Sequence, residues 1–129
     1  MWFSILAIGL GAAVGANLRW ALSLALNALF PPIPPGTLVA NLLGAWLIGI
    51  AFALFNLLPE LSPHWKLFVV TGFLGALTTF STFSLEITGQ LQAGRYLSAL
   101  AAISAHLAGS LIMTALGMAC VALVREWLR

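Results

Sequence analysis

The chain has 129 residues, of which 62% are hydrophobic and 6% are charged, and its formal net charge is +2. Soluble domains contain roughly 25% charged residues, so this composition excludes an ordinary soluble domain and predicts a protein whose apolar surface faces a lipid bilayer. The five strong bases are scattered and form no basic run, which argues against a nucleic-acid partner.

Four apolar blocks follow one another along the chain, at residues 2–27, 36–57, 65–90 and 96–124. Each reaches the roughly 20 residues that a helix needs to cross a bilayer. They are separated by "FPPIPPG", "LPELSPH" and "QAGR", in which proline and glycine end helices. We therefore predict an all-α integral membrane protein, with four transmembrane helices in one domain over residues 1–129.

The first block begins with "MWFSILAIGLGAAVGA", which lacks the basic segment of a signal peptide and continues as an apolar stretch past Arg19. We expect it to be the first span of the mature protein. Arg19 is a charge inside this span, and Glu86 in the third block is the second charge of this kind. A charge inside a span costs about 2.5 to 3.5 kcal/mol on insertion scales. Both should lie toward the same membrane face. They either form a structural pair or snorkel to the interface, or they guide an ion past a vestibule.

The second block places Asn41 within the hydrophobic sequence "GTLVANLLGAW", with Thr37 one turn earlier on the same helical face. An amide in hydrocarbon demands hydrogen-bond partners. Asn41 therefore either joins helices together or offers its NH₂ group to a passing ion, and both interpretations remain open.

The third block is too long to be one straight span. About 26 residues at 1.5 Å each give roughly 39 Å, against a hydrocarbon thickness near 30 Å. Its middle contains Gly72, Gly75 and the run "TTFSTFS", residue types that permit an interrupted helix. We expect a break between Gly72 and Thr79. Carbonyls freed near Gly75 to Thr78 suit a cation such as sodium, and two such chains around a two-fold axis would supply enough of them.

Beyond that break, Phe80 and Phe83 share a helical face, next to hydroxyl rows that include Ser81 and Thr82. Hydroxyl groups donate hydrogen bonds to an anion, and a phenyl ring has a positive edge. These residues can line an anion path, although rings packed against lipid or helices are the alternative. Thr79 and Ser84 are expected to cap backbone groups or to contact helices.

The fourth block carries His106, Ser110 and Thr114 at a spacing of four, which makes one polar stripe along a helix. The stripe predicts a solvated pathway, and hydrogen bonding of the hydroxyls to their own helix is the alternative. His106 has no second ligand at metal-binding spacing. No Ser/His/acid set, carboxylate pair or phosphate loop occurs, so we do not expect an enzyme.

The charges near the ends of the spans give little preference for one orientation. With four spans, Lys66, Arg125 and Arg129 lie on the side of both termini, while Arg95 and Arg19 lie on the other. A chain with so weak a bias is expected to insert in both orientations.

Four motifs, "GLGAAVGANLRW", "PPGTLVANLLGAWLIG", "TGFLGALTTFSTFSLE" and "AHLAGSLIMTALG", together resemble the Fluc/CrcB family of fluoride channels over all four spans. The resemblance implies an antiparallel dual-topology homodimer with two fluoride pores around a central structural sodium ion, which is not transported. That ion would be held by backbone carbonyls that match Gly75 and Thr78. The pore residues would be Asn41, Phe80, Phe83, Ser81, Thr82, Ser110 and Thr114, and Arg19 matches the family's span-one arginine.

By the same resemblance, the function would be passive efflux of fluoride from a bacterial cytoplasm through the inner membrane. The membrane potential supplies about 2.3 kcal/mol per charge per 100 mV for this step. A tyrosine that some members have in the fourth span has no counterpart here, and Ala102 or a neighbour takes its place. The alternatives are a small dual-topology cation or drug exporter, which would need a carboxylate in the first span, and a purely structural membrane subunit.

Overall fold

A computed structural model describes all residues, 1–129, as helices joined by short turns. Four helical rods are long and apolar enough to cross a membrane, as the composition predicted. The elements in chain order are α1 (Trp2–Leu26), the 3₁₀ turn η1 (Asn27–Leu29), α2 (Pro35–Leu57), α3 (Pro63–Lys66), the π-helical segment η2 (Leu67–Leu74), α4 (Gly75–Leu77), α5 (Phe80–Gln92) and α6 (Tyr96–Trp127).

The turns contain the residues that begin and end these helices. Prolines occupy the first position of α2 and of α3, where the missing N–H group costs nothing. At α3 the Ser62 hydroxyl also accepts a hydrogen bond from the His64 amide, at 3.3 Å. This cap begins the third span at Pro63, two residues before the predicted start. Gly94, with φ of 73°, makes the turn from α5 into α6.

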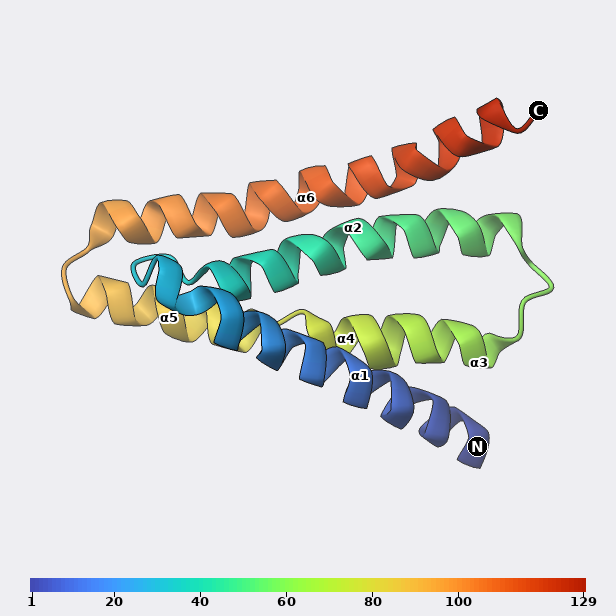
Figure 1. The fold of residues 1–129 in the computed structure, drawn as a ribbon, viewed down its shortest axis with the longest axis horizontal. Helices are drawn as coiled ribbons and strands as arrows, with labels where there is room; N and C mark the ends of the chain where they lie inside the picture. The colour runs from blue at the N-terminus through green and yellow to red at the C-terminus, as the bar shows by residue number, and fades with distance from the viewer.

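The four spans lie roughly along one long axis, and both chain termini are at the same end of the molecule (Figure 1). In Figure 1, α2 runs beside α6, and α1 crosses next to η2 and α4. Glycines allow this close approach of membrane helices. A Cβ atom at Gly49 of α2 would lie 2.2 Å from the Thr114 carbonyl oxygen of α6, so only glycine fits there.

The third span is interrupted at Thr78 and Thr79. Both have extended backbones, with φ, ψ of −81°, 153° and −148°, 115°. Helix α4 therefore ends at Leu77 and α5 starts again at Phe80, which confirms the predicted break between Gly72 and Thr79. The π-helical segment before the break was not predicted, and such segments are frequent at functional sites.

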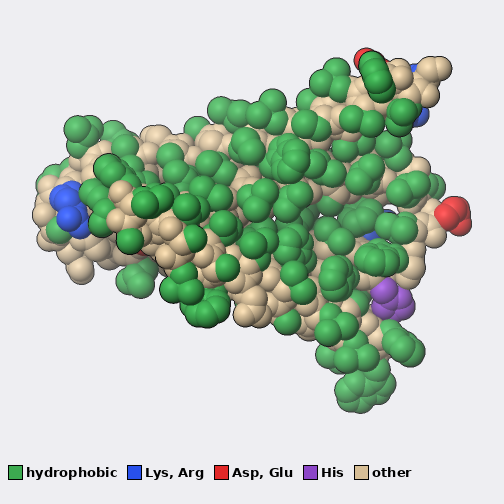
Figure 2. Space-filling view, viewed as in Figure 1, with side chains coloured by type: hydrophobic (Ala, Val, Ile, Leu, Met, Phe, Trp, Pro, Cys, Tyr) green, Lys and Arg blue, Asp and Glu red, His purple; other side chains and the backbone are tan.

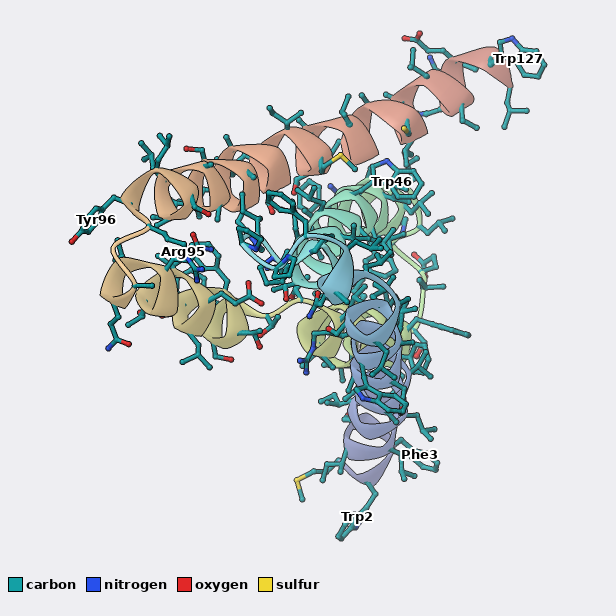
Figure 3. The ribbon with its side chains drawn as sticks, turned by 60° about the vertical axis from the view of Figure 1, so that its left-hand side comes forward. Trp2, Phe3, Trp46, Arg95, Tyr96 and Trp127 are labelled. Carbon is teal, nitrogen blue, oxygen red and sulfur yellow. The ribbon has the colours of Figure 1, made fainter.

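The face shown in Figure 2 is mostly apolar, and the charged side chains visible on it lie toward the two ends of the molecule. Only 18 of 129 residues are buried within the chain, so most apolar side chains must face lipid or another chain. Trp2 and Trp127 stand next to the two termini at one end of the molecule, and Tyr96 stands at the start of α6 at the other end (Figure 1). Figure 3 shows these three side chains pointing away from the helices around them. Amphipathic aromatic residues are typical of the two membrane–water interfaces.

Candidate functional site

A groove of about 640 Å³ runs between α2, the broken third span and α6. It brings Asn41 and the residues of the break together with the polar stripe of α6, and no acidic side chain lines it. Its polar and aromatic lining consists of Asn41, Thr78, Thr79, Phe80, Phe83, His106, Ser110 and Thr114, beside Gly75 and several aliphatic residues.

Asn41 joins α2 to the break. Its Oδ1 accepts the Thr79 N–H at 2.7 Å, and its Nδ2 donates to the Thr79 carbonyl at 3.1 Å. The extended backbone leaves both Thr79 groups without helical partners, and an unpaired peptide group is costly in hydrocarbon. The second hydrogen of Nδ2 faces Nδ1 of His106 at 3.0 Å. Of the two interpretations of Asn41, the structure supports the role of joining helices.

Thr79 also caps α5 with its side chain. Its Oγ1 accepts the Thr82 N–H at 3.2 Å and donates to Thr82 Oγ1 at 3.0 Å, and the Ser81 hydroxyl lies 3.4 Å away. Threonine is a preferred cap residue because it satisfies an orphan amide of the first turn. The expected capping role of Thr79 is therefore confirmed. Ser81 and Thr82 lie at this helix start, outside the groove of the single chain.

The break frees backbone carbonyls beside the groove. In a continuous helix the Thr79 N–H would bond to the Gly75 carbonyl, but here it donates to Asn41. The Thr78 carbonyl accepts no hydrogen bond from the chain. The Ala76 carbonyl, by contrast, accepts from Nε of Arg19 at 2.9 Å. Carbonyl oxygens of Gly75 and Thr78 thus remain available at membrane depth.

The two charges inside the spans have separate partners. Arg19 bonds to the Ala76 carbonyl, whereas Oε1 of Glu86 accepts from the Thr37 hydroxyl at 2.6 Å. They do not pair with each other within the chain. Thr37 is 1% exposed. In the sequence it stood out only because it lies one helical turn before Asn41. Its contact with α5 had no sequence signal.

Phe80 and Phe83 differ sharply in burial although they share a helical face. Phe80 is 74% exposed, whereas Phe83 is 7% exposed. Their ring centroids are 5.5 Å apart, and the Phe83 ring lies 4.6 Å from the imidazole of His106. His106 itself is 4% exposed. Phe83 therefore packs inside the chain while Phe80 projects from the groove.

The hydroxyl groups of Ser110 and Thr114, on the polar stripe of α6, do not bond to carbonyls of their own helix. Thr114 donates to the Ala45 carbonyl of α2 at 3.0 Å, which ties the two helices together. Ser110 lines the groove, and its hydroxyl group makes no hydrogen bond within the chain. A serine without a partner in such a groove is available as a donor to a ligand.

Comparison with known proteins identifies the family. The family described as "CrcB-like protein, Camphor Resistance (CrcB)" matches residues 6–118 of this chain. The chain belongs to that family. Membership of the CrcB-like family confirms the resemblance that the four motifs indicated.

Close relatives of this CrcB-like chain are named "Fluoride-specific ion channel FluC". The protein from Chromohalobacter salexigens is 68% identical, and the match covers 98% of this chain and 96% of that protein. Those from Tolumonas auensis and Chromobacterium violaceum are 60% and 57% identical, over 98% and 100% of this chain and 99% of each relative. These names describe ion channels rather than enzymes, and the chain itself is a multi-pass membrane protein with four candidate spans.

Proposed function

We propose that this chain is a fluoride-specific ion channel that lets fluoride leave a bacterial cytoplasm passively and so lowers its toxicity. The observation that carries the proposal is the groove at the broken third span, which offers hydroxyl and aromatic groups and no carboxylate. Relatives named "Fluoride-specific ion channel FluC" match almost the whole chain at 57 to 68% identity. A cation or drug exporter would need an acidic residue in α1, which has none.

The groove suits a small anion that accepts strong hydrogen bonds. Donors in a narrow passage replace the hydration shell of fluoride, whereas larger halides fit poorly. The positive edges of Phe80 and Phe83 tolerate the anion while keeping the passage narrow. The pore residues of this proposal are Asn41, Phe80, Phe83, Ser110 and Thr114 in the groove, with Ser81 and Thr82 at the start of α5.

A second copy of the chain completes the pore in this proposal. The groove lies at the surface of a single chain, and Phe80 is largely exposed. We infer an antiparallel homodimer with two pores, because the weak charge bias permits insertion in both orientations. Symmetry of this kind gives each groove the facing surface of the other chain.

The free carbonyls at the break fit a structural sodium ion. Sodium takes oxygen ligands and needs no carboxylate, and unwound backbone at membrane depth is a typical site for it. Gly75 and Thr78 provide two carbonyl oxygens in one chain and four around a two-fold axis.

The two charges inside the spans have different proposed roles. Arg19 donates a hydrogen bond to the carbonyl of Ala76, which lies between Gly75 and Thr78 in the chain, and we propose a structural role for this charge. Glu86, held by Thr37, is proposed to stand at the entrance to the pore.

Purified protein in liposomes tests the proposal. We expect rapid loss of a fluoride gradient and little chloride flux. Equal flux of both ions would contradict selectivity, and no flux of either would favour a structural subunit. Phe80→Ile and Asn41→Asp should each lower the flux while the dimer persists, and unchanged flux in both would mean that the pathway lies elsewhere.

Sodium removal tests the ion site separately. Replacing sodium by a large organic cation throughout purification should abolish fluoride flux or dissociate the dimer, and returning sodium should restore both. A channel indifferent to sodium would refute the carbonyl site without affecting the fluoride assignment.

A further inference from the structure

The break at Thr78 and Thr79 separates α5 from the helix before it. An extended backbone at these residues interrupts the ladder of helical hydrogen bonds, so the position of α4 does not determine that of α5. At its other end, α5 stops at the turn in which Gly94 has φ of 73°. The placement of α5, which carries Phe80 and Phe83, therefore depends on contacts that α5 itself makes with other elements.

The apolar packing of α5 has little directional preference. Its buried residues are Phe83, Ile87 and Gln90, whose spacings of four and three place them on one helical face. Phe83 and Ile87 pack with Ala99 and Ala102 of α6, whose side chains are single methyl groups. Burial of apolar surface is non-directional, so this contact holds α5 against α6 without fixing its direction.

Gln90 ties the far end of α5 to the turn between α1 and α2. Its Nε2 group donates a hydrogen bond to the Pro32 carbonyl, and Gln90 is 4% exposed. Four of the residues at 31–35 are prolines, which have a fixed φ and no N–H group. The remaining N–H group, that of Ile33, donates to the Phe30 carbonyl at 3.1 Å. The turn therefore offers only acceptors and is a stiff anchor for a side-chain donor.

The Gln90 amide is only partly satisfied. Exchanging its oxygen and nitrogen would place two acceptors face to face at Pro32, so the NH₂ group must point to the turn. Oε1 is buried and has no hydrogen-bond partner, which costs free energy. The Pro32 carbonyl has a second donor, the Ser98 hydroxyl at 3.4 Å. An apolar side chain at position 90 would remove the unpaired oxygen and leave that carbonyl a donor, so stability alone does not account for a glutamine here.

Polar contacts restrain α5 at three positions along its length. The partners belong to α2 or to the turn before it, and the pairs are Asn41 with Thr79, Thr37 with Glu86, and Pro32 with Gln90. The first and last contacts on α5 are 11 residues apart, which is about 17 Å at the rise of an α-helix. Two distant fixed points determine the direction of a rigid rod, and Gln90 supplies the one farther from the break.

We propose that Gln90 is a positioning residue for the fluoride pathway, an inference that rests on the proposed function. Its bond to the proline turn holds α5 in the direction that places Phe80 over the groove and Phe83 within it. Gln90 does not touch the ion. Without this bond α5 tilts about the break while the chain stays folded, and the tilt changes the width of the passage between the rings.

Gln90→Met tests the proposal, because it removes the hydrogen bond and keeps the length of the side chain. In vesicles that carry at most one channel each, the speed of fluoride loss gives the rate per channel, and the fraction of vesicles that lose fluoride gives the number of folded channels. We expect the rate per channel to fall about threefold to tenfold, because one neutral hydrogen bond changes the ratio of two conformations by about that factor. The fraction of active vesicles and the unfolding temperature should stay close to those of the wild type.

Gln92→Met, at the exposed end of α5, is the matched control and should behave as the wild type in all three measurements. An unchanged rate per channel in Gln90→Met would overturn the inference, whether or not fewer vesicles were active. A Gln90→Met chain that does not fold would overturn it as well, because Gln90 would then be needed for stability rather than for the direction of α5.

Nitrogen NMR of the channel in bilayers gives a readout that does not depend on flux. The chain has two glutamines, Gln90 and Gln92, so ¹⁵N-glutamine labelling of each Met variant leaves one side-chain amide to observe. In D₂O we expect the Gln90 amide to exchange its hydrogens at least about tenfold more slowly than the Gln92 amide, because a buried bonded group exchanges only when the structure opens locally. Equal exchange would overturn the inference. A wild-type channel without fluoride flux would instead refute the proposed function, and the exchange result would still report on the bond.

Discussion

Gly44→Ala should disturb the break in the third span by steric overlap. A Cβ atom at Gly44 of α2 would lie 2.2 Å from Cγ2 of Thr78, whereas carbon atoms pack best at about 3.5 to 4.0 Å. Thr78 cannot turn its methyl group away freely, because its hydroxyl donates to the Leu74 carbonyl at 2.9 Å. Overpacking of this kind typically costs about 1 to 3 kcal/mol.

The overlap involves one methyl group, so a second substitution can remove it. Thr78→Ser deletes Cγ2 and keeps the hydroxyl that bonds to Leu74. We expect Gly44→Ala to lower both the thermal stability of the purified protein and its fluoride flux in liposomes. The double variant should regain most of both, which gives a coupling free energy of about 1 kcal/mol or more in a double-mutant cycle.

Gly9→Ala on α1 is the matched control, because no atom lies within 4 Å of a Cβ built there. It should behave as the wild type in both assays. Wild-type behaviour of Gly44→Ala, or a defect that Thr78→Ser leaves uncorrected, would show that the contact between α2 and the break does not set the geometry of the pore.

Three further predictions follow from the same region. Asn41→Leu should destabilise the chain by about 2 kcal/mol or more, because both Thr79 backbone groups lose their partner, whereas Asn17→Leu on the exposed face of α1 should change the unfolding temperature little. Thr79→Val should cost about 1 kcal/mol through loss of the α5 cap, and an unchanged unfolding transition would contradict the cap. Phe83→Ala should destabilise by about 3 to 5 kcal/mol as a buried ring, while Phe80→Ala should reduce fluoride flux with little change in the unfolding of the single chain.

Local features of the sequence were enough to predict the spans and the break. Apolar length, proline and glycine positions and bilayer thickness act on contiguous residues, so they can be evaluated without knowing which helices are neighbours. The interruption was expected between Gly72 and Thr79 because the third block is too long for one span, and the structure places it at Thr78 and Thr79. Family membership was likewise visible in four short motifs.

Hydrogen-bond partners needed the tertiary structure. Asn41 bonds to Thr79, 38 residues away, and faces His106, 65 residues away. Arg19 donates a hydrogen bond to the Ala76 carbonyl, 57 residues away. Residue spacing fixes the direction of a side chain around its own helix, but its depth and its partner depend on the helix opposite. For this reason equal spacing could not distinguish buried Phe83 from exposed Phe80. The sequence alone determined where the chain crosses the membrane and where it breaks, and helix packing decided which polar groups are used within the chain and which remain free for an ion.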